Sequence, residues 1–189
     1  DHGKSTLIGR LLANTGSLRE GVVDKVKQIC AERGKDFEHA YLLDALQEEQ
    51  EQGITIDITK IEFSTPQRHY TIIDAPGHKE FLKNMVGGAS NADAAVLIID
   101  AQEGIQEQSK RHALLLSLLG ISQLYVVINK MDLVNYQESK FNEIRETFSD
   151  YLKQLNIHPI RYIPLSAKKG DNVTEKSENM VWDKGPHFL

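Results

Sequence analysis

Short runs of Val, Ile and Leu alternate with stretches of helical periodicity, and this alternation restricts the fold more than any other feature of the chain. The runs predict strands at residues 57–64, 69–74, 94–100, 123–129 and 160–165. Helical periodicity covers residues 79–86, 108–119 and 137–155, so the connections have the length of βαβ crossovers. The last three strands are apolar throughout, as expected of strands covered on both faces. The sequence therefore predicts an α/β fold with a mostly parallel sheet and helices on both faces.

The first two predicted strands break this pattern. The segment Pro66-Gln67-Arg68 joins them too tightly for a helix, so we expect an antiparallel hairpin at one edge of the sheet. The polar stretch before them, residues 14–52, has helical pieces but little strand character. A stretch of that length without a strand is unusual unless the segment is functional or mobile.

Composition excludes several classes of function. The 189 residues are 40% hydrophobic and 26% charged, which is typical of one globular domain. A formal net charge of −5 gives no general excess of positive charge for nucleic acid, so an RNA partner would need other domains. Cys30 is the one cysteine, which excludes an intramolecular disulfide and indicates a reducing, cytoplasmic location. The longest apolar runs, 94–99 and 114–119, are too short for a membrane helix, and we expect no membrane partner.

The chain opens with a motif that matches the second half of a phosphate-binding loop: Asp1, His2, Gly3, Lys4, Ser5 and Thr6. In such a loop, backbone N–H groups at the start of a helix converge on the phosphates of a nucleotide. The apolar stripe within residues 7–12 supplies the helix. Alternatively, Ser5 only caps an amphipathic helix and Lys4 is solvated. The motif by itself does not decide between these two readings.

A second candidate for phosphate contact follows the strand at 69–74, in the motif Asp74-Ala75-Pro76-Gly77-His78. Strand ends are where α/β folds bind ligands. Asp74 would hold a metal ion through a water, and the Gly77 N–H would meet the γ-phosphate. The alternative is an ordinary Pro-Gly turn before a helix.

A candidate base-binding motif follows the apolar strand at 123–129. Guanine offers two neighbouring donors, which one fixed carboxylate at Asp132 can accept together, whereas adenine offers no such pair. Lys130 would lay its aliphatic stem along the base, and Asn129 would tie this loop back to the phosphate loop. Ser166, Ala167 and Lys168 follow the next strand, where a small residue lets a backbone N–H reach the guanine carbonyl. The alternative for Asn129 to Asp132 is a polar strand end, and Ser-Ala-Lys alone is a very weak motif.

In this order and at these strand ends, the motifs resemble those of P-loop GTPases, and more narrowly of the translation-factor class. The narrower resemblance rests on the segment Gly53-Ile54-Thr55-Ile56-Asp57 and on the histidine of the Asp74-to-His78 motif. It implies GTP or GDP as the bound nucleotide, with Mg²⁺ held by Ser5, Thr55 and Asp74. It also implies that His78 positions the attacking water, and that the long segment before Gly53 is the first switch.

Within that class the sequence resembles two groups. Four features favour the GTP-binding subunit of bacterial sulfate adenylyltransferase: residues 51–57, the Arg111-His112 pair, residues 129–136 and the closing motifs within residues 170–186. That resemblance implies GTP hydrolysis coupled to sulfate activation, with an ATP-sulfurylase-like catalytic subunit as partner. The segment 74–85 instead favours the archaeal and eukaryotic elongation factors, which deliver aminoacyl-tRNA to the ribosome. We favour the sulfate-activating assignment and keep the elongation factor as the alternative.

The resemblance also implies that residues 1–189 are a GTP-binding domain that lacks its first strand, most of its last helix and the downstream β-barrels. Two other hypotheses remain. One is a non-catalytic module that senses the nucleotide and docks on a ribosome or RNA. The other is an ATP-dependent P-loop kinase, against which Asp132 argues.

Overall fold

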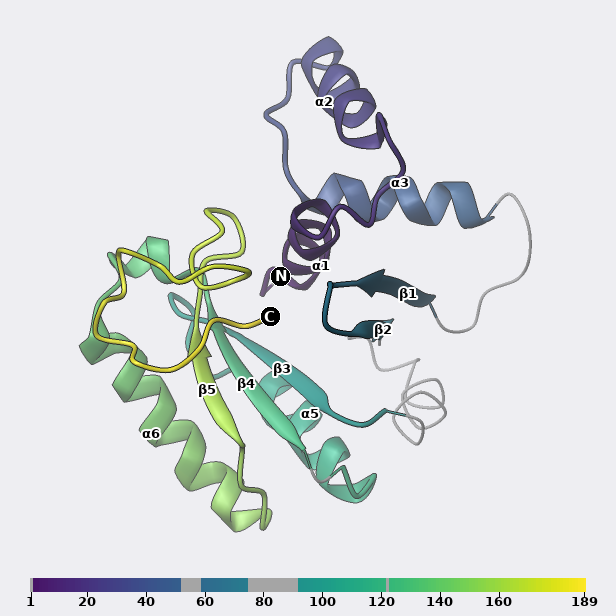
Figure 1. The fold of residues 1–189 in the computed structure, drawn as a ribbon. Helices are drawn as coiled ribbons and strands as arrows, with labels where there is room; N and C mark the ends of the chain where they lie inside the picture. The colour runs from purple at the N-terminus through teal and green to yellow at the C-terminus, as the bar shows by residue number, and fades with distance from the viewer. Residues whose placement is uncertain (1, 52–58, 75–91, 122) are drawn as a thin grey trace. The chain divides into compact units, whose positions relative to one another are not determined.

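A computed structural model describes residues 2–51, 59–74, 92–121 and 123–189. The chain groups into two compact units (Figure 1). Gly3–Asp74 forms the N-terminal unit, and His2 together with Ala75–Leu189 forms the C-terminal unit. Each unit is described by itself below.

Three helices make up most of the N-terminal unit: α1 (Lys4–Asn14), α2 (Val22–Glu32) and α3 (Ala40–Glu51). α1 buries Leu7, Ile8, Leu11 and Leu12, which recur at the spacing of one helical face. α2 and α3 share a smaller apolar cluster built on Val26, Cys30 and Leu42. The stretch predicted to hold only helical pieces therefore contains two regular helices.

The hairpin of the N-terminal unit joins β1 (Thr59–Ser64) to β2 (His69–Asp74). The strands are antiparallel, with Thr59 opposite Asp74 and Ser64 opposite His69. The Thr65 N–H donates to the Arg68 carbonyl over 2.8 Å and closes the turn. The predicted antiparallel hairpin is confirmed, and its second strand has the predicted bounds.

The C-terminal unit is built on a parallel sheet with the strand order β3 (Ala95–Asp100), β4 (Leu124–Asn129) and β5 (Arg161–Pro164). β4 lies between the other two strands, and five of its six residues are buried. Asp100 pairs with Asn129 in the ladder, and Ile128 pairs with Pro164. The carboxyl ends of β3 and β4 therefore lie level, which places the residues that follow them at one edge of the sheet.

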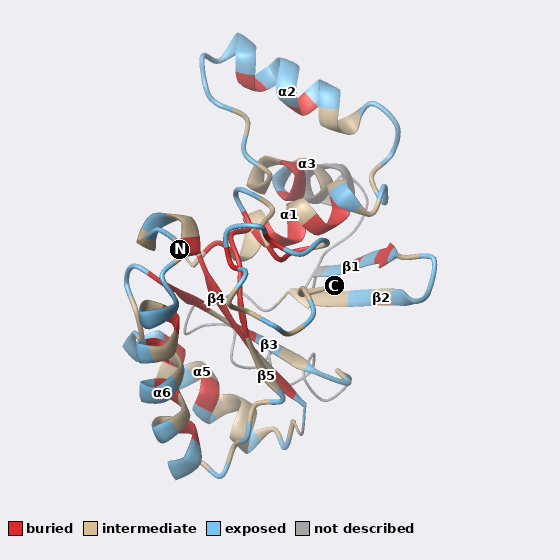
Figure 2. Ribbon diagram, turned by 60° about the vertical axis from the view of Figure 1, so that its left-hand side comes forward, coloured by how far each residue is buried: buried red, intermediate tan, exposed pale blue. Residues whose placement is uncertain are grey.

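Two α-helices and a 3₁₀ turn accompany this sheet: α5 (Glu107–Leu118), η2 (Met131–Val134) and α6 (Glu138–Gln154). The buried face of α6 consists of Phe141, Ile144, Phe148 and Leu152. These side chains share one core cluster with Ala113 of α5 and with residues of β3 and β4. Figure 2 shows the buried residues concentrated along β3 and β4 and on one side of α6.

Four of the five predicted strands lie within one residue or so of those observed, and both predicted helices of the described C-terminal unit are present. The first predicted strand is described only from Thr59 onward. The helix expected at 79–86 lies outside the described residues.

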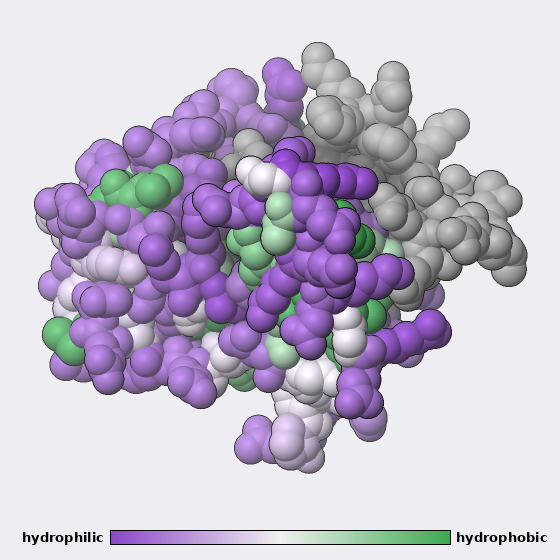
Figure 3. Space-filling model, turned by 90° about the horizontal axis from the view of Figure 1, so that it is seen from above, coloured by the Kyte–Doolittle hydropathy of each residue, from purple (hydrophilic) through white to green (hydrophobic). Residues whose placement is uncertain are grey.

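Polar groups dominate the surface that Figure 3 presents, where hydrophobic residues form only small separate patches. Among the described residues, none of the helices is long and apolar enough to cross a membrane.

Candidate nucleotide-binding site

The N-terminus of α1 has the backbone geometry that a phosphate-binding loop requires. Gly3 is the N-cap residue and has a left-handed conformation, with φ 84° and ψ 27°. No side chain caps the helix, and Ser5 lies within the first turn rather than before it. The alternative in which Ser5 caps this helix is therefore wrong. The backbone N–H groups of the first turn point out of the helix at this end, where the helix dipole favours an anion.

Lys4 and Asp74 come together within the N-terminal unit. The Lys4 Nζ lies 2.6 Å from the Asp74 Oδ1, with the Lys4 side chain 39% exposed and the Asp74 side chain 11% exposed. The start of α1 and the end of β2 therefore meet at this ion pair. A phosphate bound at the helix end would have the lysine ammonium within reach.

The same corner of the N-terminal unit fits Mg²⁺, which prefers oxygen ligands and often keeps several waters. Apart from the ion pair with Lys4, the buried Asp74 Oδ1 has no hydrogen-bond partner among the described residues. The Lys4 ammonium already supplies a positive charge at this oxygen, and a carboxylate is a ligand that Mg²⁺ accepts directly or through a water. Ser5 stands one residue after Lys4 and supplies a hydroxyl in the same turn.

Asn129, at the end of β4 in the C-terminal unit, joins two backbone segments. Its Nδ2 donates to the His2 carbonyl over 2.9 Å, and its Oδ1 accepts the Ala167 N–H over 3.0 Å. The Asn129 residue is only 1% exposed, so both bonds are protected from water. The predicted link from Asn129 to the opening motif is thus present, and it ends on the residue before Gly3.

His2 also contacts β3 and the segment that follows it. Its Nδ1 lies 3.1 Å from the Ile98 carbonyl oxygen, and its Nε2 lies 3.7 Å from the Glu103 carboxylate. These contacts occupy both ring nitrogens, so His2 anchors the start of the chain.

Lys130 adopts a left-handed conformation with φ 61°, and its side chain runs to Asp100. The Lys130 Nζ lies 2.7 Å from the Asp100 Oδ2. The other oxygen, Oδ1, accepts the N–H groups of Gln102 and Glu103 over 2.7 and 3.2 Å. The ammonium is therefore fixed at the end of β3, which extends the aliphatic stem that was predicted to flank a base.

Asp132 and the segment after β5 are also linked. The Ser166 hydroxyl donates to the Asp132 Oδ1 over 2.6 Å, and Ser166 is completely buried. Ala167 is 1% exposed, and Lys168 beside it is exposed. The structure thus brings Asn129, Lys130, Asp132, Ser166 and Ala167 into one cluster at the carboxyl edge of the sheet.

Four predicted site residues lie outside the described part of the chain, and nothing in the geometry tests them: Asp1, Thr55, Gly77 and His78.

Three residues to which the sequence motifs assigned no role at the site adjoin this cluster: Asp100, Tyr136 and Asp171. Asp100 pairs with Lys130, the Asp171 carbonyl accepts the Ser166 N–H, and the Tyr136 hydroxyl donates to Asp171. Asp100 ends an apolar strand, as Asn129 does, and this position could have drawn attention to it. Tyr136 and Asp171 stand in motifs that carry the family resemblance, but neither ends a strand, so the motifs offered no reason to place them at the site.

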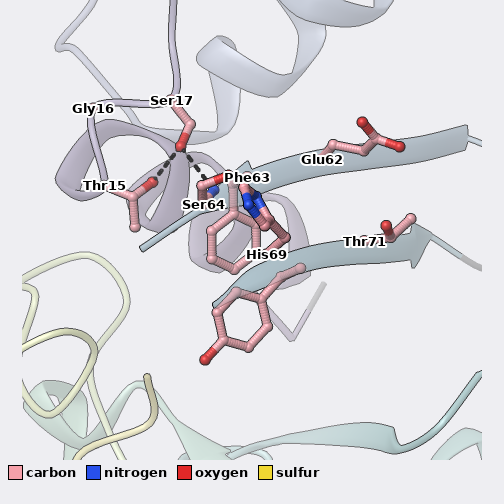
Figure 4. Close-up of a pocket in the computed structure, with 9 residues that line it drawn as sticks. Thr15, Gly16, Ser17, Glu62, Phe63, Ser64, His69 and Thr71 are labelled. Atoms are coloured by element: carbon pink, nitrogen blue, oxygen red, sulfur yellow. Dashed lines mark hydrogen bonds between the residues drawn. The ribbon is translucent and has the colours of Figure 1, made fainter. Parts of the chain in front are cut away.

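The N-terminal unit also has an open hollow of about 530 Å³ between the carboxyl end of α1 and the hairpin (Figure 4). Its polar side chains largely bond to one another. Thr15 and Ser17 hydroxyls lie 2.8 Å apart, and the Ser64 hydroxyl lies 2.6 Å from the His69 Nδ1. This hollow is at the opposite end of α1 from Gly3, so it is separate from the phosphate-binding candidates.

The fold and this cluster define a domain of the P-loop GTPase class. The model of the elongation factor Tu GTP-binding domain family matches residues 1–183. The chain therefore belongs to that family.

Similar proteins include elongation factor 1-alpha of Thermococcus kodakarensis and of Pyrococcus furiosus, each 50% identical to this chain over its whole length. The chain spans 44% of the length of these two proteins. Among solved structures, sup35 in complex with GDP matches with a TM-score of 0.67 and 27% identity, over all of this chain and 40% of that one.

Proposed function

We propose that this chain is the GTP-binding and GTP-hydrolysing domain of an elongation factor that delivers aminoacyl-tRNA to the ribosome. The observation that carries the nucleotide assignment is the Asp132 carboxylate, which a 2.6 Å bond from Ser166 holds beside Asn129 and Lys130 at the strand ends. A carboxylate fixed in this way can accept the two neighbouring donors of guanine. Adenine would leave it unpaired, which costs about 1–3 kcal/mol.

In this proposal the opening motif binds the phosphates of the nucleotide. Gly3, Lys4, Ser5 and Thr6 would contact them, because the N–H groups of a helix N-terminus point toward a bound anion and Lys4 adds a positive charge. Ser5, Thr55 and Asp74 would hold Mg²⁺. When bound, that ion would neutralise the negative charge that builds up on the phosphates during transfer.

Hydrolysis is assigned to a water that His78 orients toward the γ-phosphate, with the Gly77 N–H contacting that phosphate. Orientation is a sufficient role for His78, since phosphoryl transfer depends mainly on placement and charge stabilisation. No arginine finger is evident in the sequence, so we expect slow intrinsic hydrolysis that a partner accelerates.

Base recognition is tested by competition for bound GDP. GTP should displace GDP and ATP should not, and displacement by ATP as effective as that by GTP would overturn the nucleotide assignment. Asp132→Asn provides the matched variant, because its amide presents an N–H where xanthine carries an oxygen in place of the guanine amino group. This variant should bind xanthosine diphosphate better than GDP.

The catalytic role of His78 is tested with the full-length protein, by measuring GTP hydrolysis with and without ribosomes. His78→Ala should retain GTP binding and lose most of the stimulated hydrolysis. Unchanged stimulated hydrolysis would remove His78 from the mechanism.

The choice of elongation over sulfate activation rests on the two relatives named above, which are elongation factors 1-alpha and are 50% identical to this chain. The sulfate-activating assignment favoured on sequence motifs alone, with its ATP-sulfurylase-like partner, receives no support from them. GTP-dependent binding of aminoacyl-tRNA by the full-length protein would support elongation. Co-purification with an ATP-sulfurylase-like subunit, without tRNA binding, would overturn it.

A further inference from the structure

The loop that carries Asp132 has an unusual backbone. Three residues within seven positions have positive φ and are not glycine: Lys130 at 61°, Asn135 at 52° and Tyr136 at 53°. Left-handed conformations are unfavourable for residues with a Cβ, and most of all for bulky ones such as tyrosine. Such conformations persist when surrounding contacts over-determine them, and they concentrate at functional sites. The contacts that hold this loop are therefore informative.

Tyr136 is held from three directions. Its N–H donates to the Met131 carbonyl over 2.8 Å, and its carbonyl accepts the Trp182 indole N–H over 3.0 Å. Its hydroxyl donates to the Asp171 Oδ2 over 2.8 Å. Burial raises the pKa of the Tyr136 phenol, and the bond to Asp171 raises it further, so the hydroxyl remains a donor at neutral pH.

Asp171 connects this tyrosine to the second base-binding segment. Its Oδ1 accepts the Ser177 hydroxyl over 2.6 Å and the Asn179 amide over 3.1 Å, so its side chain is fixed on both oxygens. Its carbonyl accepts the Ser166 N–H over 3.1 Å. Ser166 in turn donates its hydroxyl to Asp132. A continuous path of hydrogen bonds and short backbone links thus runs from Tyr136 through Asp171 and Ser166 to Asp132.

We propose that Tyr136 is a positioning residue for guanine recognition. Through Asp171 and Ser166 it holds the Asp132 carboxylate in the orientation that accepts the guanine 2-amino group. Tyr136 itself does not touch the nucleotide. This inference rests on the proposed function, since it presumes that Asp132 receives guanine.

The path predicts a specific change in selectivity when the Tyr136 hydroxyl is removed. Inosine diphosphate lacks the 2-amino group of GDP, so the ratio of the two dissociation constants reports on how well Asp132 is placed. In Tyr136→Phe, we expect GDP affinity to fall and inosine diphosphate affinity to change little. The preference for GDP should therefore shrink by about threefold to tenfold, which corresponds to the net contribution of one ordinary hydrogen bond.

Tyr151→Phe is the matched control, because its hydroxyl donates to the Lys110 carbonyl elsewhere in the same unit. It should keep the wild-type ratio. Ser177→Ala removes a bond to Asp171 without touching Tyr136 and should reduce the preference in the same direction. It provides the test if Tyr136→Phe does not fold.

Equal losses of affinity for both nucleotides in Tyr136→Phe would indicate a structural role only and overturn the proposal, as would an unchanged ratio. Failure of the proposed function has a different signature. In that case the wild-type protein itself would show no preference for GDP over ATP.

Discussion

The Lys130 Nζ lies 2.7 Å from the Asp100 Oδ2, in an ion pair whose acidic partner is almost completely buried. Burial alone would raise the pKa of Asp100. The hydrogen bonds from Lys130 and from the N–H groups of Gln102 and Glu103 outweigh that effect, and the pKa is lowered. The carboxylate is therefore ionised at neutral pH and fixes the lysine of the base-binding motif.

Replacing Asp100 by Asn should destabilise the C-terminal unit. The amide can still accept the two backbone N–H groups, but it loses the charged bond to Lys130, at a cost of about 1.5–3 kcal/mol. Urea unfolding followed by fluorescence of Trp182, the one tryptophan of the chain, measures this. Equal stability of wild type and variant at neutral pH would mean that the ion pair contributes nothing.

The lowered pKa of Asp100 also predicts how the free energy of unfolding changes with pH. A carboxyl group whose pKa is lower in the folded state adds stability above its unfolded pKa and loses it as pH falls through the folded value. The pKa of Asp100 lies below the ordinary aspartate value of 3.8, so its contribution should be present at pH 5 and above and decline below about pH 4. Asp100→Asn should therefore lose less stability than the wild type between pH 5 and pH 3, roughly the window of carboxyl titration.

His39 should make the N-terminal unit sensitive to mild acid. Burial, together with the nearby charges of Arg10 and Lys27, lowers the pKa of His39 from 6.5 to about 4. Between these values the unfolded chain binds a proton that the folded chain does not, so stability should fall as pH drops from about 6.5 to about 4. Far-UV circular dichroism during thermal unfolding measures this. His39→Gln should reduce the acid sensitivity, and an identical pH profile for both proteins would contradict the assignment.

Gly9 should not tolerate a methyl group, although it lies inside a helix. A Cβ there would overlap the carbonyl oxygen of His39 and lie 2.7 Å from its carbonyl carbon, and a backbone group cannot move aside cheaply. Helix propensity alone would make Gly9→Ala stabilising by about 0.5–1 kcal/mol. We expect destabilisation instead, of about 1–3 kcal/mol, as for overpacked cores. The sign of the change in unfolding free energy decides between the two.

Arg161 should stabilise the carboxyl-terminal segment. Its Nη2 lies 3.1 Å from the Asp183 Oδ1 and 3.0 Å from the Asp183 Oδ2. The Arg161 and Asp183 side chains are 20% and 13% exposed. Arg161 also donates to the Pro186 carbonyl. Arg161→Ala should lower the unfolding free energy by about 1.5–3 kcal/mol, because a mostly buried carboxylate loses its charged partner.

The control for Arg161→Ala is the pair formed by Lys153 and Asp150, whose side chains are 65% and 73% exposed. Asp150→Asn removes an ion pair in the same unit that solvent screens well. It should leave the urea midpoint nearly unchanged. Similar changes in unfolding free energy for the two substitutions would mean that burial does not strengthen the Arg161–Asp183 pair.

The strands were predictable because local runs of apolar residues specify them. The hairpin was predictable because the four residues that connect its strands, 65–68, are too few for a crossover helix. The partnership between Asp100 and Lys130 was not predictable. It depends on the register of β3 against β4, which places Asp100 opposite Asn129, and a sequence does not display register. The motif identified Lys130 and Asp132 but gave no indication of what holds them.

The start of α1 shows a second limit. A serine near the start of an amphipathic helix favours a side-chain cap, yet the cap residue is Gly3, with a backbone conformation that only glycine adopts easily. Tyr136 shows a third limit of prediction from sequence, since nothing in its neighbouring residues indicates a positive φ. That conformation follows from bonds to Asp171 and Trp182, which are 35 and 46 residues away.

The level strand ends of the parallel sheet determine where the chain can change length. Losing one residue within β4 would turn its alternating side chains over and exchange those that face the core with those that face away. Asn129 would then no longer meet both His2 and Ala167. An extra residue beside the exposed His158 in the connection between α6 and β5 could be absorbed as a longer loop. Insertions and deletions among natural variants of this domain should therefore accumulate at the amino ends of the strands and avoid the carboxyl ends.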